Sequence, residues 1–596
     1  MGGLRHRTEM TATTLSAQDP ASAAISYGIV VSDHYSSSDG YEQYYPYNLL
    51  AEIYRPTTLK VAAVDSDSTT FSGCEYGWAV DGSTWSDTTV QLTFNTLGWH
   101  QVDLTATCHE SSSSIQAHGS FYVMVKHVRR EIRSLSDDDR RDFFTAMETV
   151  FRLDQAEGER LHGPNFRSIG VMVREHLRGA ADRTCDHWHD DAGIMTHHMS
   201  FTLEFEQSLQ SVMPHAAMHY WDYTIDSLEE DWTRSTVFEH DWFGTASPEN
   251  DDHVITDGRW SYLPVMQESG QFSEIHNPYG LLRSPWNTNP TPYVLRHRQV
   301  LGLPDGGWTL PSCSQFTAAF KLNSTAEIFN MLNGDLHGPV HIMLGGHWSF
   351  DEAHRNLSNA FRHVSSSRSI AADFLLSSKL MWREGKIRCP EVCSSDTPAS
   401  HCSCSCPADV LSAHWDAENA FTLMGLFGLD RWLHDDAFYR ESNETVTQLF
   451  NLLCHVGHAG EMFTSAAPYD PMFWPIHGNS ERFLSLRRLV AKRGLAALDE
   501  SWGYVHSDGL PSDTNLVCDW TNVKGMELPT CTKGACPGHR ARDLLPMSVE
   551  DINGTRSFMT NQEFYLFSSP DNDNLPYAYD SYSEWQGCSR ENVSFY

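Results

Sequence analysis

The stretch CDHWHDDAGIMTHHMSFTLEFEQSLQ, residues 185–210, carries a strong helix signal. Phe201, Phe205 and Leu209 recur every four residues, so a helix over this stretch would place them on one buried face. His198 stands at the beginning of that helix, and His189 lies nine residues earlier, on an expected loop or short turn. The pattern therefore predicts a core helix with histidines beside it.

A second apolar helix is predicted upstream, in FRSIGVMVREHL (166–177). Ile169, Val173 and His176 fall at positions i, i+4 and i+7, so His176 replaces a core residue on an apolar face. A buried imidazole there needs a polar partner, which either a metal ion or a backbone carbonyl could supply. This stretch alone leaves both interpretations open.

Two further stretches place histidines on helices. In LHGPVHIMLGG (336–346), His337 and His341 stand four residues apart. They would share one helix face and could share one ion, although the glutamate of the HExxH zinc proteases is missing. In YDPMFWPIHGNSERFLSLRRL (469–489), an Asp-Pro turn precedes His477, which precedes an amphipathic helix.

Imidazole ligands suit copper in both oxidation states, and zinc is the alternative metal.

Together these stretches resemble the tyrosinase, catechol oxidase and hemocyanin family, over about residues 128–586. In that family the third ligand of the first copper opens a helix with an FEQ-like sequence, and a PYWDW-like stretch follows. The matching stretches are HHMSFTLEFEQ (197–207) and HYWDYT (219–224). PYAYDSYSEW (576–585) resembles the tyrosine motif that closes the family's core domain. The resemblance implies two copper ions, each on three histidines, with dioxygen as co-substrate.

The resemblance also assigns the ligands residue by residue. The first copper is expected on His176, His189 and His198. The second is expected on His337 and His341, from the family's HNxxH and GG pattern, and on His477, from its DPxFWxHHxxxDR pattern. Ile476 stands where that pattern has the first of its paired histidines. Asp470 and Glu481 are candidates for positioning the His477 segment, with surface or capping roles as the alternative.

A different alignment of the second copper site stays open. CHVGHAGEM (454–462) could supply the second histidine and its glycine pair, which would make His455 a ligand. Its partner would then fall on Asn451, so His337 and His341 are preferred.

A second open alignment concerns the first copper site. Cys185 and His187 form the Cys-x-His that some relatives crosslink as a thioether. Choosing His187 as the ligand would require two extra residues before His198.

Residues beside the second copper site favour diphenol oxidation over monophenol hydroxylation. Relatives that hydroxylate monophenols often carry Asn after the first ligand of this copper and Glu shortly before it, and these two residues hold a water that helps to deprotonate the phenol. Gly338 and Asn333 stand at these positions. Asparagine cannot act as a base, although it can hold water. Phe473 is expected either as an aromatic wall of the site or as ordinary core.

The predicted protein is therefore an oxidoreductase of the catechol oxidase or tyrosinase type. It would oxidise small o-diphenols to o-quinones with dioxygen, with monophenol hydroxylation as a second activity. The alternatives are an oxygen carrier like hemocyanin, a shielded proenzyme, or a binding protein with a degenerate site.

The sequence predicts a multidomain chain. Residues 1–25 are polar and without period, which indicates a disordered leader. Residues 26–128 show short alternating runs between Ser, Asp and Gly turns, which predict an all-β, immunoglobulin-like sandwich. Residues 129–596 are predicted to form a mainly α dicopper domain on an antiparallel four-helix bundle, with a Cys-rich insertion at about 351–450.

The cysteines predict disulfides. Cys74 and Cys108 lie about a strand pair apart and are expected to bond. CPEVCSSDTPASHCSCSC (389–406) lacks the spacing of a zinc ribbon, so local disulfides are favoured over a thiolate metal site.

Composition limits the partners and the compartment. The 77 acidic and 42 basic residues give a formal charge of −35, which would repel nucleic acids and anionic lipid head groups. Fourteen cysteines favour a secreted or secretory-lumen protein, although no signal peptide is recognisable. Five sequons point the same way and predict a glycoprotein: Asn323, Asn356, Asn443, Asn553 and Asn592. Nothing in the sequence predicts the oligomeric state.

Overall fold

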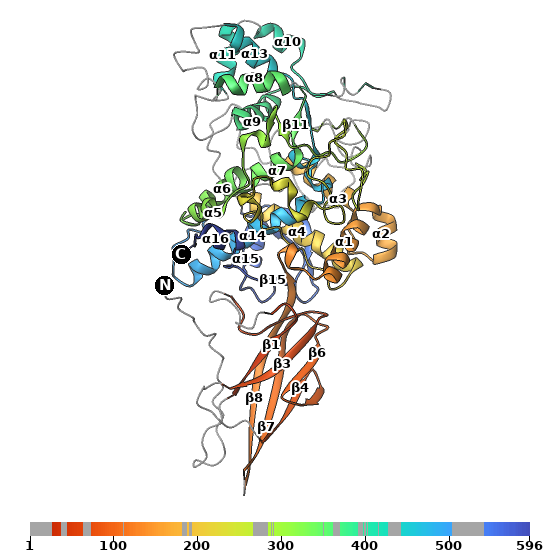
Figure 1. The fold of residues 1–596 in the computed structure, drawn as a ribbon, viewed down its shortest axis with the longest axis vertical. Helices are drawn as coiled ribbons and strands as arrows, with labels where there is room; N and C mark the ends of the chain where they lie inside the picture. The colour runs from red at the N-terminus through yellow and green to blue at the C-terminus, as the bar shows by residue number, and fades with distance from the viewer. Residues whose placement is uncertain are drawn as a thin grey trace.

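The computed structural model describes residues 27–36, 45–63, 73–110, 113–181, 188–189, 193–265, 284–287, 289, 291–349, 351–361, 370–390, 397–398, 401, 403–414, 417–426, 443–502 and 541–595. The leader predicted for residues 1–25 lies outside these ranges. The strands of residues 27–129 gather at one end of the molecule, and the helices lie in the rest together with a few short strands (Figure 1). None of the helices in the described ranges is long and apolar enough to span a membrane.

The described residues between 27 and 129 form two sheets, one of which also includes a strand from near the C-terminal end of the described chain. A three-stranded antiparallel sheet has the order β1-β3-β6, from β1 (Tyr27–Ser32), β3 (Pro56–Ala63) and β6 (Thr89–Thr93). The other sheet has the order β15-β8-β7-β4-β5, from β4 (Cys74–Val80), β5 (Ser83–Ser86), β7 (Gly98–Glu110), β8 (Ser113–Arg129) and β15 (Tyr577–Tyr579), and β2 (Leu50–Glu52) pairs with β8.

Buried side chains of both sheets form one cluster. Leu59 comes from the first sheet, and Trp78 and Val102 come from the second. Burial alternates along β4, as a strand with one solvated face requires. Cys74 and Cys108 are opposite each other in β4 and β7 and form the predicted disulfide. The immunoglobulin-like class of this β region stays a prediction.

Strand β8 continues directly into the helical part. Its last three residues pair in parallel with β15, which lies near the C-terminal end of the described chain. Arg129, at the end of β8, is fully buried and its guanidinium contacts the carboxylates of Glu206 at 2.5 Å and Glu481 at 2.9 Å. The domain boundary predicted after residue 128 therefore coincides with the end of a strand, and the division into domains stays a prediction.

Helices dominate the rest of the chain. The main body contains α1 (Asp137–Arg152), α2 (Gln155–His162), α3 (Ile169–Ala180), α4 (Gly193–Val212), α5 (Cys313–Phe320), α6 (Thr325–Met331), α7 (Gly338–Gly345), α14 (Phe473–Lys492), α15 (Asn561–Phe567) and α16 (Gln586–Glu591). A hairpin of β13 (Leu544–Glu550) and β14 (Arg556–Thr560) packs on α4. Helices α4 and α14 are almost wholly buried at the centre. That four helices form an antiparallel bundle stays a prediction.

An insertion lobe projects from this body, at the top of Figure 1. It contains α8 (Asp351–Phe361), α9 (Ile370–Arg383), α10 (Ala408–Ala413), α11 (Ala417–Leu426) and α13 (Asn443–Leu453). The chain enters it after β11 (His347–Trp348) and leaves it before β12 (His458–Ala459), and these two strands pair. A short hairpin of β9 (Gln299–Val300) and β10 (Leu303–Pro304) lies beside β11. Because the two ends meet at this pair, the insertion runs slightly beyond the predicted range of 351–450.

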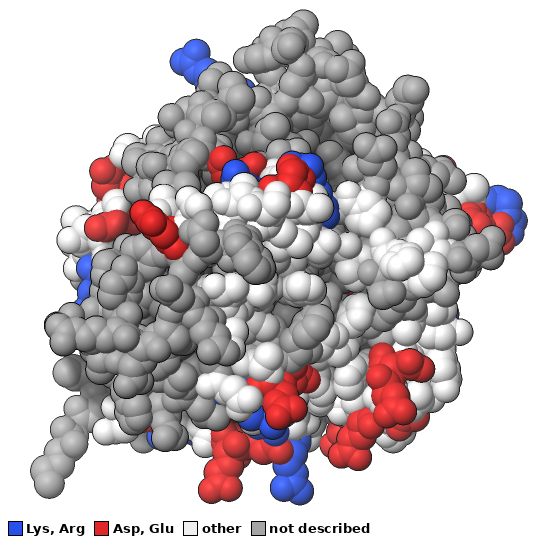
Figure 2. Space-filling model, turned by 90° about the horizontal axis from the view of Figure 1, so that it is seen from above, with Lys and Arg blue, Asp and Glu red and all other residues white. Residues whose placement is uncertain are grey.

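Disulfides hold the lobe together. Cys389 bonds to Cys404, and Cys406 bonds to Cys454. The local disulfide predicted within the Cys-rich stretch is present for Cys389 and Cys404, whereas Cys406 bonds outside the stretch, to a cysteine 48 residues further along the chain. Seen from the lobe end, the described acidic side chains are spread over several separate places, with fewer basic ones among them (Figure 2).

Candidate metal centre

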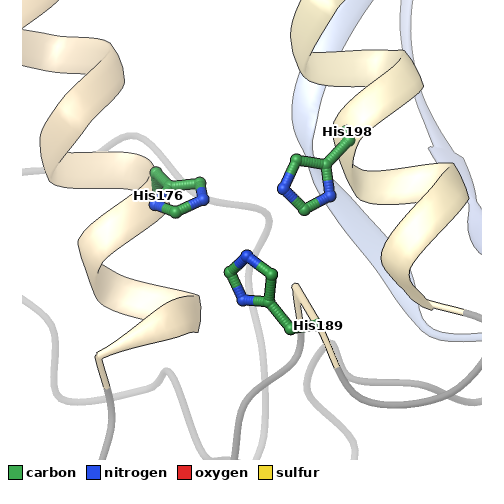
Figure 3. Close-up of side chains that lie close together, drawn as sticks. All are labelled: His176, His189 and His198. Carbon is green, nitrogen blue, oxygen red and sulfur yellow. The ribbon is translucent and has the colours of Figure 1, made fainter. Parts of the chain in front are cut away.

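Three histidines from separate elements converge beside α4. His176 comes from α3, His189 from a turn, and His198 from α4 (Figure 3). One nitrogen of each ring lies within 4.8 Å of the others. The structure thus brings together the three residues expected to hold the first copper, which we call the first triad.

A second group of three histidines, the second triad, lies nearby. His337 ends a π-helical turn (Leu332–His337), His341 lies in α7, and His477 lies in α14. The Nε2 atom of His337 is 2.8 Å from that of His341 and 3.1 Å from that of His477. These are the residues expected to hold the second copper.

The two triads face each other. The rings of His198 and His477 stack with centroids 4.6 Å apart and an interplanar angle of 7°. Phe473 is fully buried, and its ring centroid lies 4.0 Å from that of His477 and 5.5 Å from that of His176. It therefore packs as a wall against rings of both triads.

Backbone carbonyls hold four of the six imidazoles. In α4 and α14, Nδ1 of His198 bonds to the carbonyl of Ile194 at 2.7 Å, and Nδ1 of His477 bonds to that of Phe473 at 2.5 Å. Both helices begin one turn earlier than predicted, and that extra turn contributes the accepting carbonyl. A carbonyl only accepts, so Nδ1 carries the proton and the Nε2 lone pair is free for a metal ion.

The other two carbonyls come from a distant part of the chain. Nδ1 of His176 bonds to the carbonyl of Ser465 at 2.7 Å, and Nδ1 of His341 bonds to that of Met462 at 3.0 Å. These partners were missed in the sequence, because a backbone carbonyl has no signature in the residue type. Nδ1 of His337 instead lies 3.3 Å from the hydroxyl of Ser480.

Burial keeps the imidazoles neutral. Desolvation, reinforced by the neighbouring imidazoles, holds the pKa of His198, His337 and His477 well below the usual value. Burial also lowers the pKa of His341 to about 4. Neutral rings with converging Nε2 atoms fit a transition-metal ion such as copper or zinc, and do not fit a hard cation that prefers oxygen.

Asn333 and Gly338 lie beside the second triad, and each lies close to a backbone carbonyl oxygen. Asn333 donates its side-chain amide to the carbonyl of His189 at 2.6 Å, so it ties the turn of the first triad to the π-helical turn. At Gly338, an added Cβ atom would lie 2.3 Å from the carbonyl oxygen of Asn333. A side chain therefore does not fit there without a backbone shift.

The alternative candidates lie elsewhere. His455 is exposed and its Nδ1 bonds to the carbonyl of Asn451 at 2.7 Å, so it belongs to neither triad. Cys185 and His187 lie outside the described residues.

A small apolar cavity of about 10 Å³ adjoins both triads. This is about the volume that one water molecule needs. Met195 and Met199, which sequence reasoning also missed, line it one helical turn apart, together with Ile194, Leu332, His198, His337, His477 and Ser480.

Comparisons with known proteins find similarity to tyrosinases. The family model for the common central domain of tyrosinase matches residues 157–357, a range that includes five of the six histidines but not His477. A tyrosinase of Streptomyces antibioticus is 26% identical over 128 residues, which are 22% of this chain. The match spans 42% of that relative's length. Among solved structures, a tyrosinase from Burkholderia thailandensis matches at 14% identity and a TM-score of 0.25, covering 69% of this chain and 71% of that one.

Proposed function

We propose that the protein is a type 3 copper oxidase that converts o-diphenols to o-quinones, and the match of residues 157–357 to the family model for the common central domain of tyrosinase supports this proposal. The observation that carries the proposal is the pair of facing histidine triads, each offering three converging imidazole nitrogens. The first triad would hold one copper ion and the second triad the other. Two diphenols would give up four electrons and four protons to one dioxygen, which yields two quinones and two waters.

Copper bound to the triads would supply the electron transfer between diphenol and dioxygen. The protein itself keeps the imidazole rings neutral and orients their metal-binding nitrogens toward the metal positions. The backbone carbonyls retain the Nδ1 protons, so each Nε2 lone pair stays available without prior deprotonation. Three protein ligands per ion would leave a coordination position open, which is typical of reactive sites.

Exposure indicates the side from which a phenol would approach. His189 and His341 are partly exposed, whereas the other four histidines are buried. Phe473 is fully buried, and the apolar cavity is lined by the buried His198, His337 and His477. We therefore expect the aromatic ring of the substrate to enter beside His189 and His341.

One contact and one residue type support diphenol oxidation over monophenol hydroxylation. The amide nitrogen of Asn333 is engaged with the carbonyl of His189, and position 338 has no side chain. Neither residue therefore offers a base that would deprotonate a monophenol.

Oxygen uptake by copper-loaded protein tests the proposal, first with catechol and then with a monophenol. We expect uptake with catechol, little with the monophenol, and none by the His341→Ala protein with either. Equal uptake with both phenols would refute the roles given to Asn333 and Gly338. Copper-loaded protein that takes up no oxygen with catechol would instead indicate an oxygen carrier, a shielded proenzyme or a degenerate site.

We also propose that the protein passes through the secretory pathway. The described disulfides require an oxidising compartment, and the sequon residues Asn323, Asn356, Asn553 and Asn592 are exposed. Mass spectrometry of the native protein tests this. Glycans on these residues would support it, and reduced cysteines without glycans would contradict it.

A further inference from the structure

One short segment contacts a histidine of each triad. Residues 461–470 supply the carbonyl of Ser465 to His176 and the carbonyl of Met462 to His341. These histidines come from two different helices, α3 and α7. The segment also leads directly into α14, where the amide of Phe473 bonds to the carbonyl of Asp470 at 2.9 Å.

The beginning of this segment is anchored to residues 289–296. Glu461 is buried, and its carboxylate accepts a hydrogen bond from the amide of Leu295 at 2.6 Å and contacts the side chain of Asn289. Within the segment, Thr464 donates its hydroxyl to the carbonyl of Glu461 at 3.0 Å and accepts from the amide of Ala466 at 3.0 Å. These bonds fix the direction in which the Met462 and Ser465 carbonyls point.

The end of the segment is anchored by a buried ion pair. Arg296 holds Asp470 through two parallel hydrogen bonds of 2.7 and 2.6 Å, and both side chains are fully buried. The same guanidinium donates to the carbonyls of Phe243 at 2.9 Å and Gly244 at 3.1 Å. A forked, fully bonded guanidinium of this kind leaves its partner little freedom to move.

We propose that residues 461–470 are a single positioning segment for both metal positions, and that Arg296 fixes it through Asp470. This inference rests on the proposed binding of one copper ion by each triad. The segment sets the orientation of one imidazole per triad, so disturbing it weakens both ions together. Loss of a partner that orients a metal ligand typically costs about 10–100-fold in metal affinity.

The variant Arg296→Lys tests the proposal, because it keeps the charge beside Asp470 and loses the fork. Arg298→Lys is the matched control. Arg298 stands two residues away and pairs with Asp231 at 2.8 Å and Asp305 at 3.0 Å, outside the segment. Metal-free full-length protein is titrated with Cu(II) against a competing chelator.

Arg296→Lys and Arg298→Lys are each combined with two background variants that keep one complete triad. The His341→Ala background keeps only the first triad complete, and the His176→Ala background keeps only the second. We expect Arg296→Lys to weaken Cu(II) binding about 10–100-fold in both backgrounds, and Arg298→Lys to change neither. The visible spectrum of the Co(II)-loaded protein should shift with Arg296→Lys only, because the imidazoles are turned. A general loss of stability would not move that spectrum.

Weakening in one background only, or in neither, would overturn the inference and leave the proposed function standing. If Arg296→Lys does not fold, Thr464→Val is tested in its place by the same Cu(II) titrations. It removes only the hydroxyl hydrogen bonds that shape the segment, and its results are interpreted in the same way. Wild-type protein that binds fewer than two ions would overturn the proposed function, and the inference with it.

Discussion

Glu461 should make the stability of the metal-free protein fall as the pH rises. Burial raises the pKa of this carboxyl from 4.5 to about 8, although hydrogen bonds from Leu295 and Asn289 oppose the rise. Because the folded chain holds the proton more tightly than the unfolded chain, the stability from the neutral carboxyl is fully present below pH 4.5. It is lost as the pH rises toward 8.

The size of the effect follows from the same values. A rise in pKa from 4.5 to about 8 corresponds, at about 1.4 kcal/mol for each pH unit, to about 5 kcal/mol in total. Because the carboxyl is half titrated at each end of that range, the change between pH 4.5 and pH 8 is about 4 kcal/mol. The variant Glu461→Gln keeps a neutral group of similar shape and cannot titrate. The free energy of unfolding of the wild type, minus that of the variant, should therefore decrease by about this amount between pH 4.5 and 8.

Urea unfolding of both metal-free proteins, followed by tryptophan fluorescence at half-unit pH steps, measures the difference. Using the difference between the proteins cancels the contributions of the other titrating groups. A difference that stays constant with pH, or one that grows with pH, would refute the reasoning. It would mean that Glu461 is ionised in the folded chain across this range.

Three further outcomes are expected. His341→Ala should reduce the copper content from two ions to one and abolish oxygen uptake, whereas the control His455→Ala should leave the copper content and the oxygen uptake unchanged. Metal analysis and an oxygen electrode measure these two quantities. Asn333→Leu should weaken the first copper about 10–100-fold and leave the second unchanged, since it removes the bond to the carbonyl of His189; Cu(II) titration distinguishes the two ions. Gly338→Ala should cost about 1–3 kcal/mol in stability, because its Cβ atom meets a backbone oxygen at 2.3 Å; thermal unfolding measures the loss.

Periodicity anticipated the helical positions of some of the histidines, but not that of His189, which lies on a turn. The four-residue spacing of His337 and His341 and the apolar face around His176 are local properties of the chain. The structure places these residues in the two triads. The assignment of each triad to a copper ion stays a proposal.

The features that the sequence pattern did not predict depend on contacts between residues that are far apart in the sequence. The bond from His176 to Ser465 joins residues 289 positions apart through a backbone carbonyl, which any residue type could supply. The pairing of β15 with the end of β8 is likewise non-local. Asn333 illustrates a third limit, since the sequence does not show that its side-chain amide donates to the backbone of His189.

The paired strands at the base of the lobe have a consequence for engineering. Trp348 and His458 are opposite each other in an antiparallel ladder, so their Cα atoms lie about 5 Å apart. A tight turn could span that gap, which makes the whole lobe an exchangeable cassette. Val300, Leu301 and Phe463 of the main body pack into the lobe's apolar cluster, so a replacement cassette must also cover these side chains.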